Sequence, residues 1–156
     1  MITKMSHTSL FVLDQEKAYD FYINKLGFKV NTDVVMGGGD TNCDDAAEAA
    51  KNAEEHGGAG FRWLTINPPD QPDLEIILMP LAGFDAEAQQ ALRLLLERGL
   101  LGAGVFYTPD CRATYEELKG KGVQFKSEPK EQFYGLECII TDGVGNWFSM
   151  TEPKAH

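Results

Sequence analysis

The chain contains one sequence pattern twice, about 96 positions apart. Residues 7–14 (HTSLFVLD) form an expected strand that ends at an Asp, and residues 103–110 (AGVFYTPD) repeat this arrangement. An expected helix follows each Asp, and another strand follows each helix. Internal similarity at a fixed spacing constrains the architecture more than any local signal does. The sequence therefore predicts two copies of one module, which differ at their first position, His7 against Ala103.

Composition limits the class of the protein and of its partners. A length of 156 residues fits one compact domain, with 43% hydrophobic and 24% charged residues, as in ordinary globular proteins. No apolar run reaches the ~18 residues of a membrane span, and no signal-peptide core follows Met1. We therefore expect a cytoplasmic protein with no membrane partner. The net charge of −10 also argues against nucleic acid, which attracts basic patches.

Each half is expected to continue in the order strand, helix, three strands. The expected strands are 7–13, 28–35, 61–67 and 73–79 in the first half, and 103–109, 123–128, 132–141 and 146–151 in the second. Helices are expected directly after Asp14, over 85–98 and over 110–120. Residues 37–60 have glycines at both ends and no apolar stripe, so they are interpreted as an exposed insertion.

In the order and spacing of these pieces, the chain resembles the vicinal oxygen chelate superfamily of glyoxalases, bleomycin resistance proteins and extradiol dioxygenases. The most specific pieces are residues 7–27 and the turn 142–146 (DGVGN), which is similar to Asp-Pro-x-Gly-Asn. The stretches 61–65 (FRWLT) and 134–135 (YG) add to the likeness. The resemblance implies an α+β fold, in which two βαβββ modules form curled mixed sheets around a concave cleft, with helices on the outer face.

The resemblance also implies a domain organisation and partners. One glyoxalase-like domain would span 1–156, with module one at 5–80, the insertion at 37–60, the connecting helix at 85–98 and module two at 102–152. The expected partners are a small-molecule ligand and a second copy of the chain, as a homodimer.

Metal-dependent members of the family hold their metal at four positions, and the resemblance carries these over to His7, Glu75, Ala103 and Ser149. Glu75 is an acid inside an apolar strand, which is a costly place unless a metal or a polar neighbour such as Arg62 or Thr65 compensates it. Ala103 has no donor atom, and Ser149 is neutral where the family places Glu. Because catalytic zinc takes about three protein ligands, the pair His7 and Glu75 predicts weak or no metal binding.

The resemblance further implies which side chains line the cavity. The candidate ligand-binding residues are Phe11, Trp63, Thr65, Tyr107, Tyr134, Trp147 and Ser149. Alternation places the other set under the helices: Leu10, Val12, Leu64, Ile66, Leu74, Ile76, Leu78, Phe106, Phe148 and Met150. The alternative is that these aromatic residues only build strands, because strands favour them.

Two functions compete at this point. The first is a metal-independent protein that binds or sequesters a drug or metabolite in an aromatic cleft, with no cofactor, and the incomplete metal quartet favours it. The second is an enzyme, a lyase, isomerase or dioxygenase-like protein that acts on a hydroxy-carbonyl compound. His7 and Glu75 would then be the catalytic residues, as a base or as ligands of a divalent metal, and their presence in one half favours this alternative.

Overall fold

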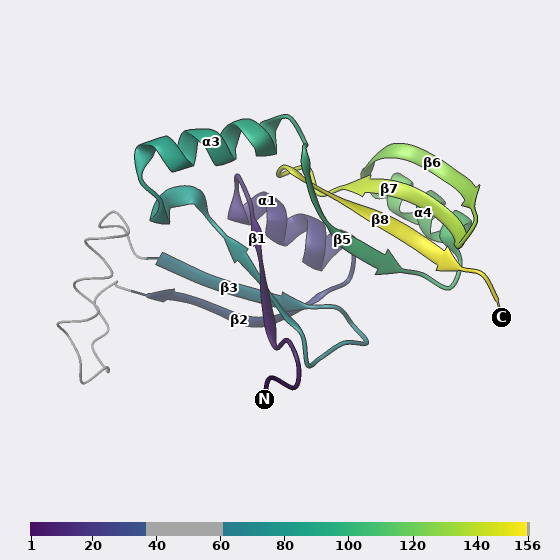
Figure 1. Ribbon diagram of the computed structural model, residues 1–156, viewed down its shortest axis with the longest axis horizontal. Helices are drawn as coiled ribbons and strands as arrows, with labels where there is room; N and C mark the ends of the chain where they lie inside the picture. Colours follow the sequence, from purple (N-terminus) through teal and green to yellow (C-terminus); the bar gives the residue numbers. More distant parts are fainter. Residues whose placement is uncertain (37–60, 156) are drawn as a thin grey trace.

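The computed structural model describes residues 1–36 and 61–155, and it contains two four-stranded mixed sheets (Figure 1). The first has the order β1-β4-β3-β2, with β1 His7–Phe11, β2 Lys29–Met36, β3 Phe61–Asn67 and β4 Glu75–Met79. The second has the order β5-β8-β7-β6, with β5 Leu101–Tyr107, β6 Gln124–Gln132, β7 Gly135–Thr141 and β8 Asn146–Pro153. In each sheet the first strand lies parallel to the last, and the other pairs are antiparallel. The repeated order confirms the two βαβββ modules. The predicted insertion, 37–60, lies outside the described residues.

Within 1–36 and 61–155, each α-helix begins at an aspartate side chain that accepts a backbone N–H. The helices are α1 Gln15–Tyr19, which continues as a π-helical segment η1 Asp20–Lys25, then α3 Ala86–Glu97 after a short 3-10 turn η2 Leu81–Gly83, and α4 Cys111–Gly120. The caps are Asp14, Asp85 and Asp110, with N–O distances of 3.0, 2.9 and 2.8 Å. Over 1–36 and 61–155, no helix is both long and apolar enough to cross a bilayer.

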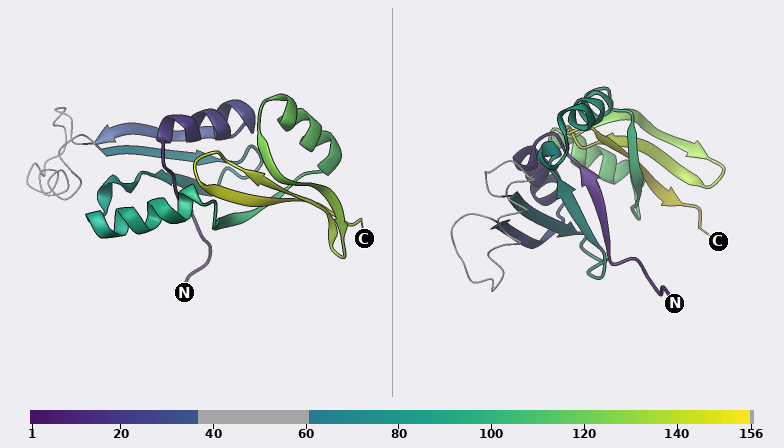
Figure 2. Two further views of the ribbon diagram at one scale, coloured as in Figure 1. Left: turned by 90° about the horizontal axis from the view of Figure 1, so that it is seen from above. Right: turned by 60° about the vertical axis from the view of Figure 1, so that its left-hand side comes forward.

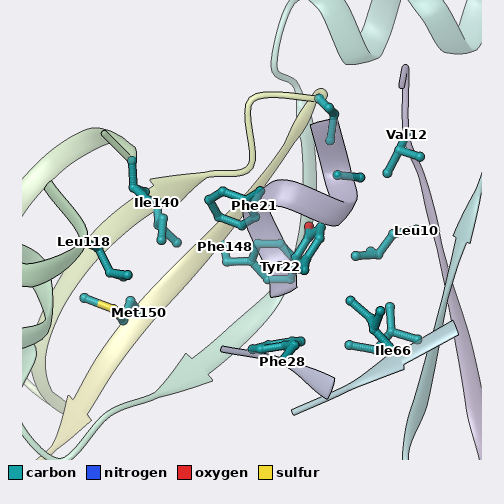
Figure 3. Close-up of a cluster of buried hydrophobic side chains, with 14 of the residues drawn as sticks. Leu10, Val12, Phe21, Tyr22, Phe28, Ile66, Leu118, Ile140, Phe148 and Met150 are labelled. Carbon is teal, nitrogen blue, oxygen red and sulfur yellow. The ribbon is translucent and has the colours of Figure 1, made fainter. Parts of the chain in front are cut away.

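The two sheets share one hydrophobic core. Figure 3 shows the α1–η1 segment between them, with Phe21 and Tyr22 pointing toward Phe148 on β8 and Leu10 on β1. The ring centroids of Tyr22 and Phe148 lie 6.3 Å apart in an edge-on arrangement. The helical segment thus serves both modules, and each sheet turns one face toward this core and one face away from it. We call the two faces that point away the first open face (β1–β4) and the second open face (β5–β8).

Period-two alternation predicted which residues enter the core. The buried ones are Leu10, Val12, Leu64, Ile66, Ile76, Leu78, Phe148 and Met150. Phe106 is half-buried and packs against them. Leu74 is the exception, because β4 begins only at Glu75 and Leu74 precedes the strand, half-buried and outside the core cluster. The predicted register is therefore confirmed, with one residue misplaced at a strand end.

The turn between β7 and β8 fastens the second module to the first. Asp142 is 3% exposed, and its carboxylate accepts hydrogen bonds from the Tyr22 hydroxyl (2.7 Å), the Asn146 side chain (2.9 Å) and the backbone N–H groups of Val144 and Asn146 (both 2.9 Å). The Asn146 amide also donates to the Phe11 carbonyl at 2.8 Å. Buried polar groups are tolerated when they are bonded in this way. The turn therefore joins helix η1 and strand β1 to the second sheet.

The connecting helix α3 differs from its sequence prediction. The spacing of Ala88, Ala91, Leu92, Leu95 and Leu96 gives the helix an apolar face and predicts that this face packs on the core, but only Leu96 is buried, while Leu95 stays 37% exposed. Leu96 lies against Gly145, where an added Cβ would come within 2.6 Å of it. The helix therefore packs through its C-terminal end, and the rest of its apolar face is wrongly predicted as buried.

Candidate functional site

The first open face brings His7 and Glu75 together. They lie opposite each other on the parallel strands β1 and β4, with 3.4 Å between Nε2 and Oε2. Their side chains are 46% and 24% exposed, so solvent reaches both. At this distance the two side chains form an ion pair when the ring is protonated. His7 is thus the polar partner of Glu75.

Arg62, the neighbour considered as an alternative partner for Glu75, has other contacts. Its guanidinium donates two hydrogen bonds to the Asp33 carboxylate, at 2.7 and 2.8 Å, and also contacts Glu16. These bonds lower the pKa of the exposed Asp33 carboxyl below its ordinary value. Arg62 therefore joins β2, β3 and α1 and does not compensate Glu75.

The donor set for a metal is too small in the described residues. In 1–36 and 61–155, no group of three or more His, Cys, Asp or Glu side chains gathers where it could hold an ion. His7 and Glu75 offer two donors, and catalytic zinc takes about three from protein. The residues present do not fit a divalent metal.

We expect the purified, untagged protein to carry no stoichiometric nickel, zinc, manganese or iron, because two donors bind these ions weakly. Elemental analysis by mass spectrometry after gel filtration checks this. A ratio near one ion per chain that falls in a His7→Gln variant would contradict it.

The other candidates of the first open face differ in accessibility. Trp63 is half-buried beside Phe61, with ring centroids 6.3 Å apart. Phe11 is half-buried and meets the ring of Phe84 edge-on at 5.5 Å. Thr65 is fully buried, and its hydroxyl accepts a hydrogen bond from the Thr32 backbone N–H at 3.2 Å. The pairing of Thr65 with Ile77 places Trp63 level with Met79 and Phe11, at the other end of β4 from Glu75, whereas Thr65 supports the sheet.

The second open face carries the remaining candidates. Tyr107 on β5 is 80% exposed, Trp147 on β8 is half-buried, and Ser149 on β8 is 8% exposed. Tyr134, in the turn between β6 and β7, is 39% exposed. These four share one sheet, while His7, Phe11, Trp63, Thr65 and Glu75 belong to the other.

The two halves differ in register as well as in residue type. His7 lies directly opposite Glu75, but Ser149 lies opposite Val105. Ala103, which the internal repeat aligns with His7, falls at an irregularity of the β5–β8 pairing between Gly102 and Gly104. Its side chain packs against the core. The second half therefore does not reproduce the His7–Glu75 geometry.

The second open face also carries a carboxylate that is not among the predicted site residues. Glu137 on β7 accepts a hydrogen bond from the Ser149 hydroxyl at 2.5 Å, and the Ser149 and Thr151 hydroxyls lie 3.0 Å apart. The Glu137 carboxylate raises the pKa of Tyr134, first by hydrogen bonding to its hydroxyl. We call Glu137, Ser149, Thr151 and Tyr134 the carboxylate cluster. The signal was available, because residues 136–139 (LECI) place an acid in an apolar strand, as residues 74–77 (LEII) do.

The chain does not bring its two open faces over a common cleft. In the right-hand view of Figure 2 the two sheets lie on different sides of the molecule. A hollow of about 380 Å³ lies between the η1 segment and the second module, and another of about 420 Å³ lies beside the end of α3. Neither is lined by the candidate residues. The fold class is confirmed, and within one chain its sheets stay open.

Two further groups, Cys111 and Cys138, are buried thiols without a catalytic environment. Both are fully buried, with sulfur atoms 3.9 Å apart. Burial raises the pKa of Cys138 to about 12 and that of Cys111 above its ordinary value. Since the thiolate is the nucleophile, both thiols are inert in the folded protein near neutral pH.

We therefore expect iodoacetamide at pH 8 to alkylate Cys111 and Cys138 slowly in the native protein and rapidly in urea. Mass spectrometry of the two peptides that carry them gives each rate separately. Equal rates in native and unfolded protein would show that the thiols are accessible.

Comparisons with known proteins agree with this geometry. Residues 4–150 match the family model described as "Glyoxalase/Bleomycin resistance protein/Dioxygenase superfamily". YurT of Bacillus subtilis (strain 168), an uncharacterized protein, is 31% identical over 150 residues, which cover 96% of this chain and 98% of YurT. The crystal structure of UcmS2 is 34% identical with a TM-score of 0.79, covering 97% of this chain and 99% of UcmS2. TnmS3, an antibiotic binding protein from Streptomyces sp. CB03234, is 25% identical with a TM-score of 0.66, covering 98% of both chains.

Proposed function

Because the chain belongs to the glyoxalase/bleomycin resistance protein/dioxygenase superfamily, we propose that it binds and sequesters a small molecule, a drug or a metabolite, without a metal. The observation that carries the proposal is the makeup of the two open faces. Each carries a tryptophan and an acid within an apolar strand, and of these two acids Glu75 has a histidine beside it while Glu137 has a serine hydroxyl. The antibiotic binding of TnmS3, at 25% identity, supports the same ligand class.

Exposed apolar side chains support a ligand on the second open face. Val105 and Tyr107 are 61% and 80% exposed on β5, and Ser149 pairs with Val105 in the same face. Soluble proteins rarely leave contiguous apolar surface in water unless it contacts a ligand or a partner. The face therefore suits a molecule with a flat apolar body.

We further propose that the chain acts as one glyoxalase-like domain in a cytoplasmic homodimer. Small-molecule sites bury ~70–90% of the ligand surface, and a single open sheet covers only one side of a ligand. A second copy that covers an open face would supply the missing side. Sedimentation velocity tests this directly, and a monomer at micromolar concentration would contradict the dimer.

An enzyme is the second candidate, favoured by the His7–Glu75 pair. The pair is solvent-accessible, with 3.4 Å between Nε2 and Oε2, so a substrate on this face would meet a ring nitrogen and a carboxylate together. A lyase, isomerase or dioxygenase-like reaction on a hydroxy-carbonyl compound would use it. In the binding protein, by contrast, the pair only contacts the ligand.

The two tryptophans provide the test, because they are the only ones in the chain and each lies on a different sheet. The variants Trp63→Phe and Trp147→Phe leave one fluorescent reporter on one open face. Both proteins are titrated with a panel of aromatic antibiotics that includes bleomycin. We expect saturable quenching in at least one of them and recovery of the ligand unchanged by mass spectrometry. Conversion of the ligand by the wild type, lost in Glu75→Gln, would establish the enzyme instead.

A further inference from the structure

We propose that Glu137 is a recognition site for a protonated amine on the second open face. The inference rests on the proposed binding function and adds the chemistry of the ligand, an aromatic body that carries an ammonium group.

Hydrogen bonds hold the Glu137 carboxylate firmly in place. Its oxygen accepts the Ser149 hydroxyl at 2.5 Å, and Ser149 lies 3.0 Å from the Thr151 hydroxyl. Ser149 and Thr151 are 8% and 4% exposed, so water has little access to these donors. Hydrogen bonds to an ionised carboxylate are stronger than those between neutral groups. The cluster therefore holds the carboxylate in position through neutral hydroxyl donors.

The Glu137 carboxylate has no cationic side chain beside it in the described ranges. Within the described ranges, no Lys, Arg or His nitrogen lies within 4.0 Å of the Glu137 carboxylate. Lys130 is its register partner on β6 and is exposed without reaching it. Lys126 donates to the Gly99 carbonyl at 2.6 Å and lies 5.8 Å from the centre of the Trp147 ring. The half-buried charge of Glu137 is thus available to an external cation.

The acid on the first open face differs from Glu137 in having a basic side chain as its partner. There, His7 approaches Glu75 to 3.4 Å and supplies a partner from the chain itself. Over 1–36 and 61–155, the partners of the Glu137 carboxylate are the hydroxyls of Ser149 and Tyr134. Of the two acids in apolar strands, Glu137 is therefore the one that can form an ion pair with a cationic ligand.

The surface around the Glu137 carboxylate includes exposed apolar and aromatic side chains. Tyr107 and Val105 are strongly exposed on β5. Tyr107 lies level with Thr151 and Glu137 across the sheet, and Val105 lies level with Ser149, while Trp147 lies further along β8, opposite Thr141. Aromatic faces attract cations as well as flat apolar rings. The net charge of −10 also raises the local concentration of cations and disfavours anionic ligands. Together these features suit an aromatic amine better than a neutral or acidic aromatic molecule.

The test compares two probes of one shape. At pH 8, 9-aminoacridine carries a positive charge and acridine is neutral. We expect the wild type to bind 9-aminoacridine more tightly than acridine, measured by fluorescence titration and calorimetry. Glu137→Gln should weaken 9-aminoacridine about 10- to 100-fold, as expected for the loss of a hydrogen-bonded charge, and change acridine binding little.

Glu131→Gln is the matched control. It removes the same charge from β6, but Glu131 is exposed and pairs with the core-facing Leu136, so it belongs to the other side of the sheet. The Glu131→Gln protein should still bind 9-aminoacridine more tightly than acridine, as the wild type does. A second measurement needs no variant, because added KCl should reduce the preference of the wild type by screening the charge. Circular dichroism and thermal unfolding verify that each variant is folded.

The outcomes separate this inference from the proposed function. Equal binding of both probes by the wild type, or a preference that survives in a folded Glu137→Gln protein or in high salt, would overturn the amine site. If acridine still binds saturably in that case, the binding function stands. If neither probe binds and neither single-tryptophan protein is quenched by the antibiotic panel, both proposals fail.

Discussion

Replacing Asp142 with Ala is expected to lower the free energy of unfolding by about 3–5 kcal/mol, because several buried donors lose their acceptor at once. These donors come from Tyr22 in the first module and from Val144 and Asn146 in the turn. Unsatisfied buried N–H and O–H groups cost far more than an exposed hydrogen bond contributes. Urea denaturation followed by circular dichroism measures the difference.

Asp110 provides the matched control for this variant. It is an exposed aspartate that accepts the Ala113 N–H at the start of α4. Asp110→Ala should cost about 1 kcal/mol, the usual value for an N-cap. If Asp142→Ala costs no more than Asp110→Ala, the turn does not fasten the two modules as described.

The second large effect separates two neighbours on β4. Ile76 is 6% exposed in the core, and Glu75 lies on the open face. Ile76→Ala should lower the free energy of unfolding by about 2–5 kcal/mol through lost burial and a cavity. Glu75→Gln should change it by less than about 1 kcal/mol, because an exposed ion pair contributes little.

Thermal and urea unfolding of the two variants test this, and the binding assay completes the comparison. Glu75→Gln should fold normally and alter ligand binding or turnover at the first open face. A Glu75→Gln protein as unstable as Ile76→Ala would show that Glu75 supports the core.

Much of the fold follows from two simple sequence patterns. The repeat predicts two modules of one topology, and alternation predicts which residues of β1, β3, β4 and β8 are buried. These inferences succeed because the strand period is two, so a single buried position determines the orientation of its neighbours. The failures lie where the period is interrupted. Leu74 precedes β4, and Ala103 falls at the irregular pairing between two glycines.

The contacts between strands were harder to predict. His7 and Glu75 were paired only through the family resemblance, and the contact of Glu137 with Ser149 was missed, although Glu137 lies in the same kind of apolar strand as Glu75. Alternation determines the face on which a side chain lies but not which strand lies beside it. The exposed leucines of α3 were mispredicted for a similar reason, because an apolar stripe does not reveal whether a partner covers it.

The shared core has a consequence for how such a chain can diverge. Stability depends on one set of alternate residues in each strand, and the ligand recognition that we propose uses the intervening set, which points away from the core. Selection can therefore change one set with little cost to the other. The duplicated module illustrates the result, since one copy retains a histidine–carboxylate pair and the other has an acid bonded to hydroxyls, on sheets of identical strand order. A duplication of this kind allows two ligand specificities to evolve separately while both copies remain dependent on a single folding unit.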